Sequence, residues 1–478
     1  MQFSGGKKGD EMTDSNKPQG ESVLAVAEPP SDPVDCKVHA WLCENIGPVL
    51  RLDRHARWRP GWDATVLKDG VELPLYVRGP RGDTYVSPVD MVQEAEIHRV
   101  FEAHGILAPH VYGMIPDPLS IVMEMLPGKI DTSTIKDDQM RRSVRRSFIE
   151  IVAKVHEIPV EEFADTKLPV PETPRDIALN LYAPSEAIFR DRIGGRDWPL
   201  MEFAWAWLLR NVPDHCARPS FVNYDGGQFL FDETGKVTGL IDFEVSSFGD
   251  PVAELSGMRL RDTSEPLGDL TELIAYYEEL TGAKIPNRVI EFHSAGFCAV
   301  NGFLMWPLMF DSAPEQDYVA YMNYCVATSR WMIRAMADHD GVVLKDPPAP
   351  KANQLGFAQA GRHLIRHLSM MPSGTPAEDY ARDSAVAQTT YMARQAEFGL
   401  DVLAANLLDI EEITGERLDT WDAALAALSR YVASADRQSD AALILLFHRW
   451  LQRQAFLLEG CGPAAFLPAK DLQPIRQR

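Results

Sequence analysis

Two carboxylates near the middle of the chain have the type and spacing of a metal site. Asp242 follows Leu240-Ile241, so it stands at the end of a predicted buried strand, and Glu244 comes two residues later. Residues two apart in a strand point to the same face. Mg²⁺ prefers oxygen ligands and usually takes one or two protein carboxylates, with phosphates and water completing its shell. Asp242 is therefore a candidate Mg²⁺ ligand; the alternative is an acid that hydrogen-bonds the end of a hairpin.

The elements that must position this site alternate between strand-like and helical patterns in the first part of the chain. Residues 65–79 hold two short strand patterns around the turn signal Lys68-Asp69-Gly70. Met91 to His104 has apolar residues at helical spacing, and residues 120–128 form an apolar strand that stops at Pro127-Gly128. Further along, the patterns are mainly helical, except that FLF and VTGLI predict two strands just before Asp242.

Composition excludes several classes of function. The net charge of −22 argues against nucleic acid or an anionic membrane as the main partner, because phosphate backbones favour clustered Lys and Arg. No apolar run is long enough to cross a bilayer, and the N-terminal segment lacks the pattern of a secretory signal. Six scattered cysteines without a CxxC pair indicate free thiols in a reducing compartment. We therefore expect a cytoplasmic protein.

The run LIDFE, followed by FGDPVAEL, resembles the metal-binding segment of the aminoglycoside phosphotransferase and choline-kinase-like family. The resemblance covers about residues 45–335. It implies an α+β, bilobal protein-kinase-like fold, with a small antiparallel sheet in the N-lobe and a mainly helical C-lobe. It also implies that ATP is the phosphate donor and that Asp242 binds the Mg²⁺ that bridges the phosphates of ATP.

Other segments resemble further motifs of this family, in the expected order. IVMEMLPG resembles the hinge between the lobes, which places the backbone of Glu124 and Leu126 near the adenine. LYVRG resembles the strand whose basic residue grips phosphates, which implicates Arg78. Glu94 sits where the family's helix offers an acid to that base. Each assignment has an alternative interpretation. Met123-Glu124 could be a plain strand edge, Arg78 a solvated residue at the end of a strand, and Glu94 a surface partner for a nearby arginine.

The catalytic loop of the family usually reads His-Gly-Asp, four residues, then Asn, and here two alignments are open. In one, Asp225 is the base, but Gln228 then arrives two residues early, a displacement of roughly 7 Å. In the other, which needs no gap, Phe221 replaces His, Asn223 replaces Asp and Gln228 replaces the metal-holding Asn. We favour the ungapped frame because it preserves the loop length. Asn223 and Asp225 both stay catalytic candidates, with Gln228 as a second metal ligand.

The turn expected to cover the nucleotide also departs from the family pattern. RWRPGWDAT has one Gly and two Trp where the family tends to have Gly and Ser, which indicates a stiffer flap. Arg57 or Arg59 could approach phosphates from it. An ordinary turn with surface arginines explains the same residues equally well.

Five segments result from the resemblance and the composition. We expect a disordered leader (1–35), an N-lobe (36–126), a C-lobe (127–345), a Pro-rich linker (346–354) and an all-helical C-terminal domain (355–478). The apolar faces of the C-terminal helices predict a dimerisation module, a substrate lid or a docking platform for a protein partner.

The sequence supports three hypotheses for function. The first is an ATP- and Mg²⁺-dependent phosphotransferase acting on a hydroxyl group of a small molecule, slow or atypical because Asn223 replaces the catalytic Asp. Aminoglycoside-like antibiotics, choline-like alcohols and hydroxyacyl-CoA thioesters are substrates within the resemblance. The second is a pseudokinase, a nucleotide-binding or scaffolding protein. The third, a different reaction on the same fold, has no direct support in the sequence.

Overall fold

A computed structural model of the protein describes residues 27–55, 59–81, 87–214, 216, 218–310, 312, 316–353 and 355–476. Arg57 of the predicted flap and nearly all of the predicted leader lie outside these residues.

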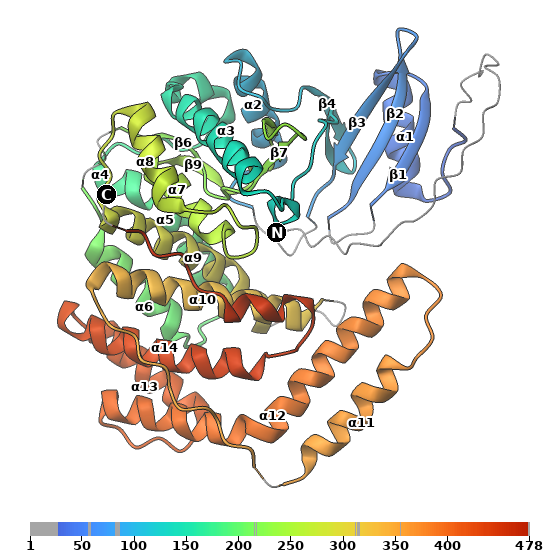
Figure 1. Cartoon of the computed structure of the whole chain (residues 1–478). Helices are drawn as coiled ribbons and strands as arrows, with labels where there is room; N and C mark the ends of the chain where they lie inside the picture. Colours follow the sequence, from blue (N-terminus) through green and yellow to red (C-terminus); the bar gives the residue numbers. More distant parts are fainter. Residues whose placement is uncertain are drawn as a thin grey trace.

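An antiparallel sheet of five strands forms the N-lobe (Figure 1). Its order is β1-β2-β3-β5-β4, with β1 (Val49–Arg54), β2 (Gly61–Lys68), β3 (Val71–Arg78), β4 (Val111–Pro116) and β5 (Leu119–Glu124). Lys68 pairs with Val71 across the predicted turn, where Asp69 and Gly70 both have positive φ. That conformation matches the right-handed twist of a two-residue hairpin, and Asp-Gly favours it.

Two helices pack on this sheet. α1 (Pro33–Asn45) contributes Val38 and Leu42 to a core with Val49 and Trp62 of the sheet. α2 (Met91–Ala103) lies on the side of the second lobe, and its Ala95 packs with β4 and β5. The N-terminus of α2 is closed by a capping box between Asp90 and Gln93, which fixes the start of the helix that carries Glu94.

The rest of the chain is mainly helical and includes two small two-stranded sheets. β6 (Ser220–Asn223) pairs with β9 (Ser246–Gly249), and β7 (Phe229–Phe231) pairs with β8 (Val237–Leu240). The helices of the second lobe are α3 (Asp138–Glu157), α4 (Pro174–Leu179), α5 (Tyr182–Arg192), α6 (Pro199–Asn211), α7 (Val252–Arg261), α8 (Leu270–Thr281), α9 (Asn287–Phe310) and α10 (Tyr318–Asp340). The predicted α+β architecture, with a sheet-based lobe and a helical lobe, is confirmed.

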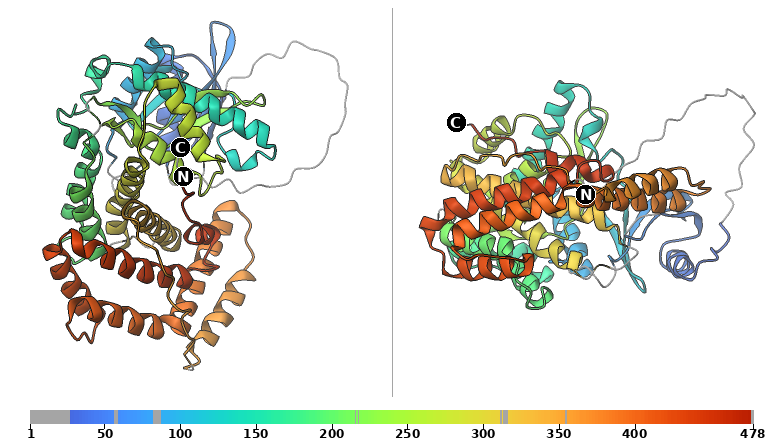
Figure 2. Two further views of the ribbon diagram at one scale, coloured as in Figure 1. Left: turned by 60° about the vertical axis from the view of Figure 1, so that its left-hand side comes forward. Right: turned by 90° about the horizontal axis from the view of Figure 1, so that it is seen from below.

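Four further helices follow a stretch without helix or strand between α10 and α11. They are α11 (Phe357–Ser369), α12 (Pro376–Thr414), α13 (Trp421–Ser434) and α14 (Asp440–Leu457). Figure 2 shows α13 and α14 running beneath the second lobe, while Figure 1 shows α11 and the first half of α12 extending away from it. The described helices lack the combination of length and apolar character that a membrane span requires.

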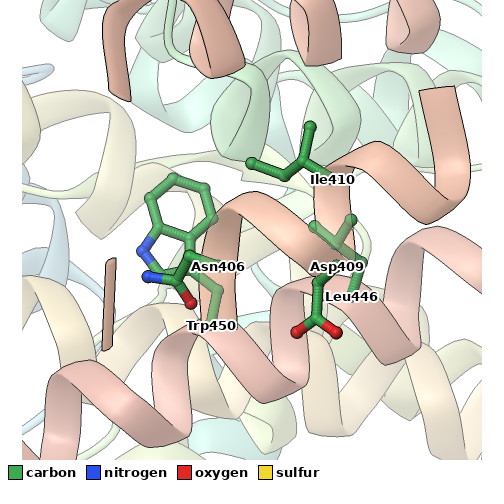
Figure 3. A pocket seen from close by; sticks show the side chains of 5 residues that line it. All are labelled: Asn406, Asp409, Ile410, Leu446 and Trp450. Carbon is green, nitrogen blue, oxygen red and sulfur yellow. The ribbon is translucent and has the colours of Figure 1, made fainter. Parts of the chain in front are cut away.

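Three of the C-terminal helices, α12, α13 and α14, share one hydrophobic core with α5, α6, α9 and α10. Where α12 meets α14, a gap too narrow for a water molecule is lined by Asn406, Asp409 and Ile410 of α12 and by Leu446 and Trp450 of α14 (Figure 3). Arg453 of α14 closes this contact by donating to Asn406 Oδ1 at 2.8 Å and to Asp409 Oδ2 at 2.7 Å. The chain end then returns to the second lobe, where Arg259 Nε donates to the carbonyl oxygen of Gln473 at 2.8 Å. The division of the chain at residues 346–354 stays a prediction.

Candidate active site

Asp242 lies two residues past β8 in a backbone conformation that few residues other than glycine adopt. Its φ is 62°. Two hydrogen bonds hold the backbone at this position. The N–H of Ile241 donates to the carbonyl oxygen of Gln228 at 3.0 Å, and Asn223 Nδ2 donates to the carbonyl oxygen of Asp242 at 3.4 Å. Strained residues of this kind persist where the surroundings over-determine them, and they cluster at functional sites.

Arg78, at the end of β3, connects the two carboxylates predicted to accompany it. Its Nε donates to Glu94 Oε2 at 3.0 Å, and its Nη2 pairs with Asp242 Oδ1. The other oxygen of Glu94 accepts from the N–H of Phe243 at 3.1 Å. The three side chains are 10%, 3% and 18% exposed for Arg78, Glu94 and Asp242. The structure thus brings together residues from β3, α2 and the segment after β8.

Glu244 gathers three guanidinium groups at the same place. It pairs with Arg59 of the flap and with Arg81, which follows β3, and its Oε2 is 3.6 Å from Arg78 Nη2. The sequence did not single out Arg81, although RGPRGD shows a second arginine three residues after Arg78. Three arginines of the first lobe therefore lie close to Asp242 and Glu244.

The pKa values of the two acids in this cluster are shifted in opposite directions. Burial by itself would raise the pKa of Asp242, but Arg78, Arg59 and Arg81 outweigh burial and hold the pKa of that carboxyl below its usual range. Burial and the neighbouring charge of Asp242 raise the pKa of Glu244. Asp242 is therefore ionised throughout the neutral range, which a metal ligand requires.

Asn223 occupies the end of β6, directly beside Asp242. It pairs with Ser246 in the β6–β9 sheet, and its N–H donates to Glu254 Oε2 at 2.6 Å. Its side chain lies between two groups, because Nδ2 donates to the carbonyl oxygen of Asp242 and Oδ1 accepts from Ser246 Oγ, each at 3.4 Å. β7 begins at Phe229, so five residues connect β6 to β7, a length that favours the ungapped alignment.

Asp225 and Gln228 are both held inside that loop. Arg261 Nη2 lies 3.0 Å from Asp225 Oδ1, and Gln228 Nε2 donates to Asp225 Oδ2 at 2.8 Å. Both carboxylate oxygens of Asp225 are therefore engaged by side chains of the protein. This geometry argues against Asp225 as the base.

Phe221, in the place of the family's His, is part of an aromatic cluster. Its ring stacks on Phe163 with centroids 5.0 Å apart and meets Phe101 edge-on at 5.3 Å. It also contacts Phe243, the residue after Asp242, with centroids 6.2 Å apart. A histidine in this fully buried apolar cluster would lack polar partners, and buried polar groups are costly without them.

The predicted hinge residues stand where the sheet leads into the second lobe. The N–H of Glu124 donates to the carbonyl oxygen of His110 at 2.8 Å, so it is not available to an adenine ring. The next N–H, of Met125, donates to the carbonyl oxygen of Pro74 at 3.3 Å. Leu126 packs closely against Gly239 of β8, at a point that a Cβ on Gly239 would fill. The adenine role of Glu124 and Leu126 stays a prediction.

Comparison with known proteins matches part of this chain to a family. The model of the phosphotransferase enzyme family, APH, matches residues 55–285. This stretch is similar to that family, as the sequence motifs indicated. No curated protein matches the chain significantly.

Several solved structures resemble about three fifths of this chain, at low identity. They include macrolide 2'-phosphotransferase type I (20% identity, TM-score 0.43, covering 61% of this chain and 94% of that one) and MphH from Brachybacterium faecium, another macrolide 2'-phosphotransferase (17%, 0.42, 61% and 95%). A third is a thermostable mutant of the aminoglycoside phosphotransferase APH(4)-Ia with ADP and hygromycin B (15%, 0.42, 62% and 98%). The kinase-like fold expected from the sequence is confirmed by the family match together with the observed strand order.

The donor set of the phosphotransferase domain suits Mg²⁺ bound together with phosphates. The described residues include no group of three His, Cys, Asp or Glu side chains that could enclose a metal on its own. Mg²⁺ does not need one, since it takes few protein ligands when phosphates are present. Among the described residues, Oδ2 of Asp242 accepts no hydrogen bond, and the backbone carbonyl of Gln228 accepts one from the N–H of Ile241, the residue before Asp242.

Glu254 of α7 is a positioning residue that the sequence reading did not identify. It is buried beneath the catalytic loop, and its carboxyl accepts from the N–H of Asn223. Burial raises its pKa from the ordinary 4.5 to about 8, a shift that the hydrogen bond from Asn223 opposes. The signal in the sequence was the run GDPVAEL, which carries Glu254 four residues after Asp250.

Because the folded protein binds a proton at Glu254 that the unfolded chain has lost, stability should fall as pH rises from about 4.5 to 8. Each pKa unit corresponds to about 1.4 kcal/mol, so the loss should amount to a few kcal/mol. Glu254→Gln, which imitates the neutral acid, should flatten this dependence and be the more stable protein at pH 8.5. Urea unfolding at pH 5.5 and 8.5 measures it, with exposed Glu279→Gln as control. Parallel pH profiles for wild type and Glu254→Gln would contradict the assignment.

Proposed function

We propose that this chain is an ATP- and Mg²⁺-dependent phosphotransferase that acts on a hydroxyl group of a small molecule, with a catalytic loop that works without the usual aspartate. The observation that supports it most is the meeting of Arg78, Glu94 and Asp242 from three separate elements. These ion pairs are largely buried, and the cost of desolvating buried charges offsets most of their mutual attraction. Stability alone therefore explains the cluster poorly. Ionic clusters of this kind suit a site that receives a charged ligand.

In this proposal the arginines receive the phosphates. Arg78 is held by Glu94 and would contact the nucleotide phosphates, while Arg59 and Arg81 approach the same space through Glu244. Planar guanidinium groups donate two parallel hydrogen bonds to phosphate oxygens. Asp242, with Gln228 as a second oxygen donor, would hold Mg²⁺, which when bound neutralises charge on the β- and γ-phosphates.

Asn223 would orient the attacking hydroxyl rather than deprotonate it. Its amide can accept a hydrogen bond from a substrate hydroxyl, but it takes up no proton near neutral pH. Phosphoryl transfer depends chiefly on positioning and charge neutralisation, so the hydroxyl proton can leave late, to a phosphoryl oxygen or to solvent. A general base typically contributes about 10²–10⁴-fold, which sets how slow such an enzyme would be.

One set of contacts favours a pseudokinase as the second candidate. Asp225 is paired with Arg261, and Phe221 is packed into the aromatic cluster, so neither offers proton-transfer chemistry. A pseudokinase would bind nucleotide without turnover and would use the C-terminal helices to dock a second copy or another protein.

Glu94→Gln tests whether Glu94 positions Arg78 for the nucleotide. Loss of a hydrogen bond to a charged group costs about 1.5–3 kcal/mol, so affinity for an ATP analogue should fall roughly ten- to a hundredfold. Calorimetric titration of the folded variant measures the change. Glu96→Gln, two residues along the same helix and paired with Arg99, is the control and should bind as wild type does. Equal affinity in all three proteins would remove Arg78 and Glu94 from the site.

Release of ADP in the presence of hydroxyl compounds distinguishes the two candidates. A panel of aminoglycosides, macrolides, choline-like alcohols and hydroxyacyl-CoA thioesters should contain one class that raises ADP release above the substrate-free rate. That increase should vanish in Asp242→Asn. Saturable binding of ATP with Mg²⁺, without release stimulated by any compound, would favour the pseudokinase.

A further inference from the structure

A basic cavity lies at the junction of the second lobe with the C-terminal helices, and none of its lining residues belongs to the candidate active site. Its volume is about 300 Å³. It is bounded by the end of α6, the start of α9, the end of α10 and the short 3₁₀ turn η3 (Arg437–Ser439) between α13 and α14. A ligand in this cavity would therefore touch both regions of the chain at once.

Three arginines and one histidine line this cavity, and its described lining residues include no carboxylate. They are Arg210, Arg288, Arg437 and His339. A local cluster of positive charge is unusual in a chain whose net charge is −22. Guanidinium groups are the side chains best suited to phosphates and carboxylates.

The charged groups that line the cavity differ in their partners. Arg210 pairs with Asp440 at the start of α14, and His339 Nδ1 lies 2.7 Å from Asp340 Oδ1. Arg437 Nη2 donates to Asn211 Oδ1 at 3.0 Å, and the charge of Arg437 also lowers the pKa of Asp340 and opposes the rise in the pKa of Asp440. Within the described part of the chain, neither Arg437 nor Arg288 forms an ion pair, and both are exposed.

The remaining wall is apolar. Val212, Pro213 and Val289 line it together with Phe292, whose side chain is fully buried. Small-molecule sites combine such apolar surface with a few converging polar groups. The cavity thus has room and contacts for more than a bare ion.

We propose that this cavity binds a small phosphate-bearing anion, with Arg288 and Arg437 as its principal contacts and Arg210 as a third. The two exposed arginines come from α9 and from η3, so a phosphate between them would join the second lobe to the C-terminal helices. The site is separate from the proposed nucleotide site and does not depend on the proposed function.

Calorimetric titration of the full chain with pyrophosphate, at constant ionic strength and without Mg²⁺, tests the proposal. The double variant Arg288→Gln/Arg437→Gln should bind at least about tenfold more weakly than wild type, because two charge-assisted contacts are lost. The control Arg366→Gln/Arg417→Gln removes the same charge from two other exposed arginines and should bind as wild type does. Arg78→Met, at the nucleotide site, should retain the binding.

Three results would overturn the proposal. They are absence of saturable binding in wild type, equal weakening in the two double variants, and a loss confined to Arg78→Met. Unfolding midpoints without pyrophosphate should match between wild type and Arg288→Gln/Arg437→Gln, because both side chains are exposed. The loss of binding can therefore be separated from a loss of structure.

Discussion

Asp242→Asn is expected to abolish the Mg²⁺-dependent part of ATP binding while leaving the fold intact. Asparagine keeps the size of the side chain and is among the residues that best tolerate the positive φ found at this position. Arg78 retains Glu94 as a partner, so no buried charge is left alone. The variant therefore removes the metal-binding charge and little else.

The effect should be large in a thermal unfolding experiment. A ligand present at a hundred times its dissociation constant stabilises the folded state by about 2.7 kcal/mol, and wild type should gain this from ATP with Mg²⁺. In Asp242→Asn the increment caused by Mg²⁺ should disappear. Asp138→Asn, an exposed acid on α3, should respond as wild type does. An undiminished increment in Asp242→Asn would exclude this carboxylate as the metal ligand.

Asn223→Asp is expected to raise turnover by about 10²–10⁴-fold, because it places a general base where the loop lacks one. The position is suited to it, since Asn223 already lies beside Asp242 at the end of β6. Steady-state ADP release with a stimulating hydroxyl compound measures the gain. The gain should appear in kcat, since an amide at this site can already bind the hydroxyl.

Asp225→Asn provides the matched comparison in the same loop. Its carboxylate is engaged by Arg261 and Gln228, so its replacement should cost stability through the broken buried pair and leave the chemistry of the folded enzyme largely unchanged. If Asp225→Asn abolishes turnover and Asn223→Asp adds none, the gapped alignment is correct and the base is Asp225.

The residues of the central cluster could be proposed from sequence, Asp242 from its own position after a predicted strand, and Arg78 and Glu94 from segments that resemble motifs of the family. Asp242 follows a buried strand, Arg78 ends one, and Glu94 lies in the first turn of an amphipathic helix. The turn at Asp69-Gly70 was equally readable, since its backbone conformation selects its residues. The preference for the ungapped alignment rests on the loop length between two strands, and it stays a prediction.

Other parts of the site were not readable because they arise from long-range contacts. Arg59 and Arg81 reach Glu244 from positions more than 160 residues earlier in the chain, and nothing in their own neighbourhoods indicates this. The importance of Glu254 depends on its burial beneath Asn223, which composition does not reveal. The basic cavity draws its arginines from three distant helical regions in the same way.

The C-terminal helices show why a boundary is hard to place from local patterns. The Pro-rich segment before α11 does coincide with a stretch without helix or strand. Yet Phe447 of α14 stacks on Phe203 of α6, with centroids 5.5 Å apart, inside one continuous core. The exposed apolar side chains of α11 and α12, such as Phe357, Leu364 and Leu400, leave docking of a second copy or a protein partner as a prediction.

The most direct test is a crystal structure of the protein with a non-hydrolysable ATP analogue and Mn²⁺, which takes the place of Mg²⁺ and scatters anomalously. We predict an anomalous peak bonded to a carboxylate oxygen of Asp242 and to phosphate oxygens, with Arg78 turned from Asp242 toward the phosphates. Bound nucleotide with no metal beside Asp242, and with the Arg78–Asp242 pair intact, would contradict the account.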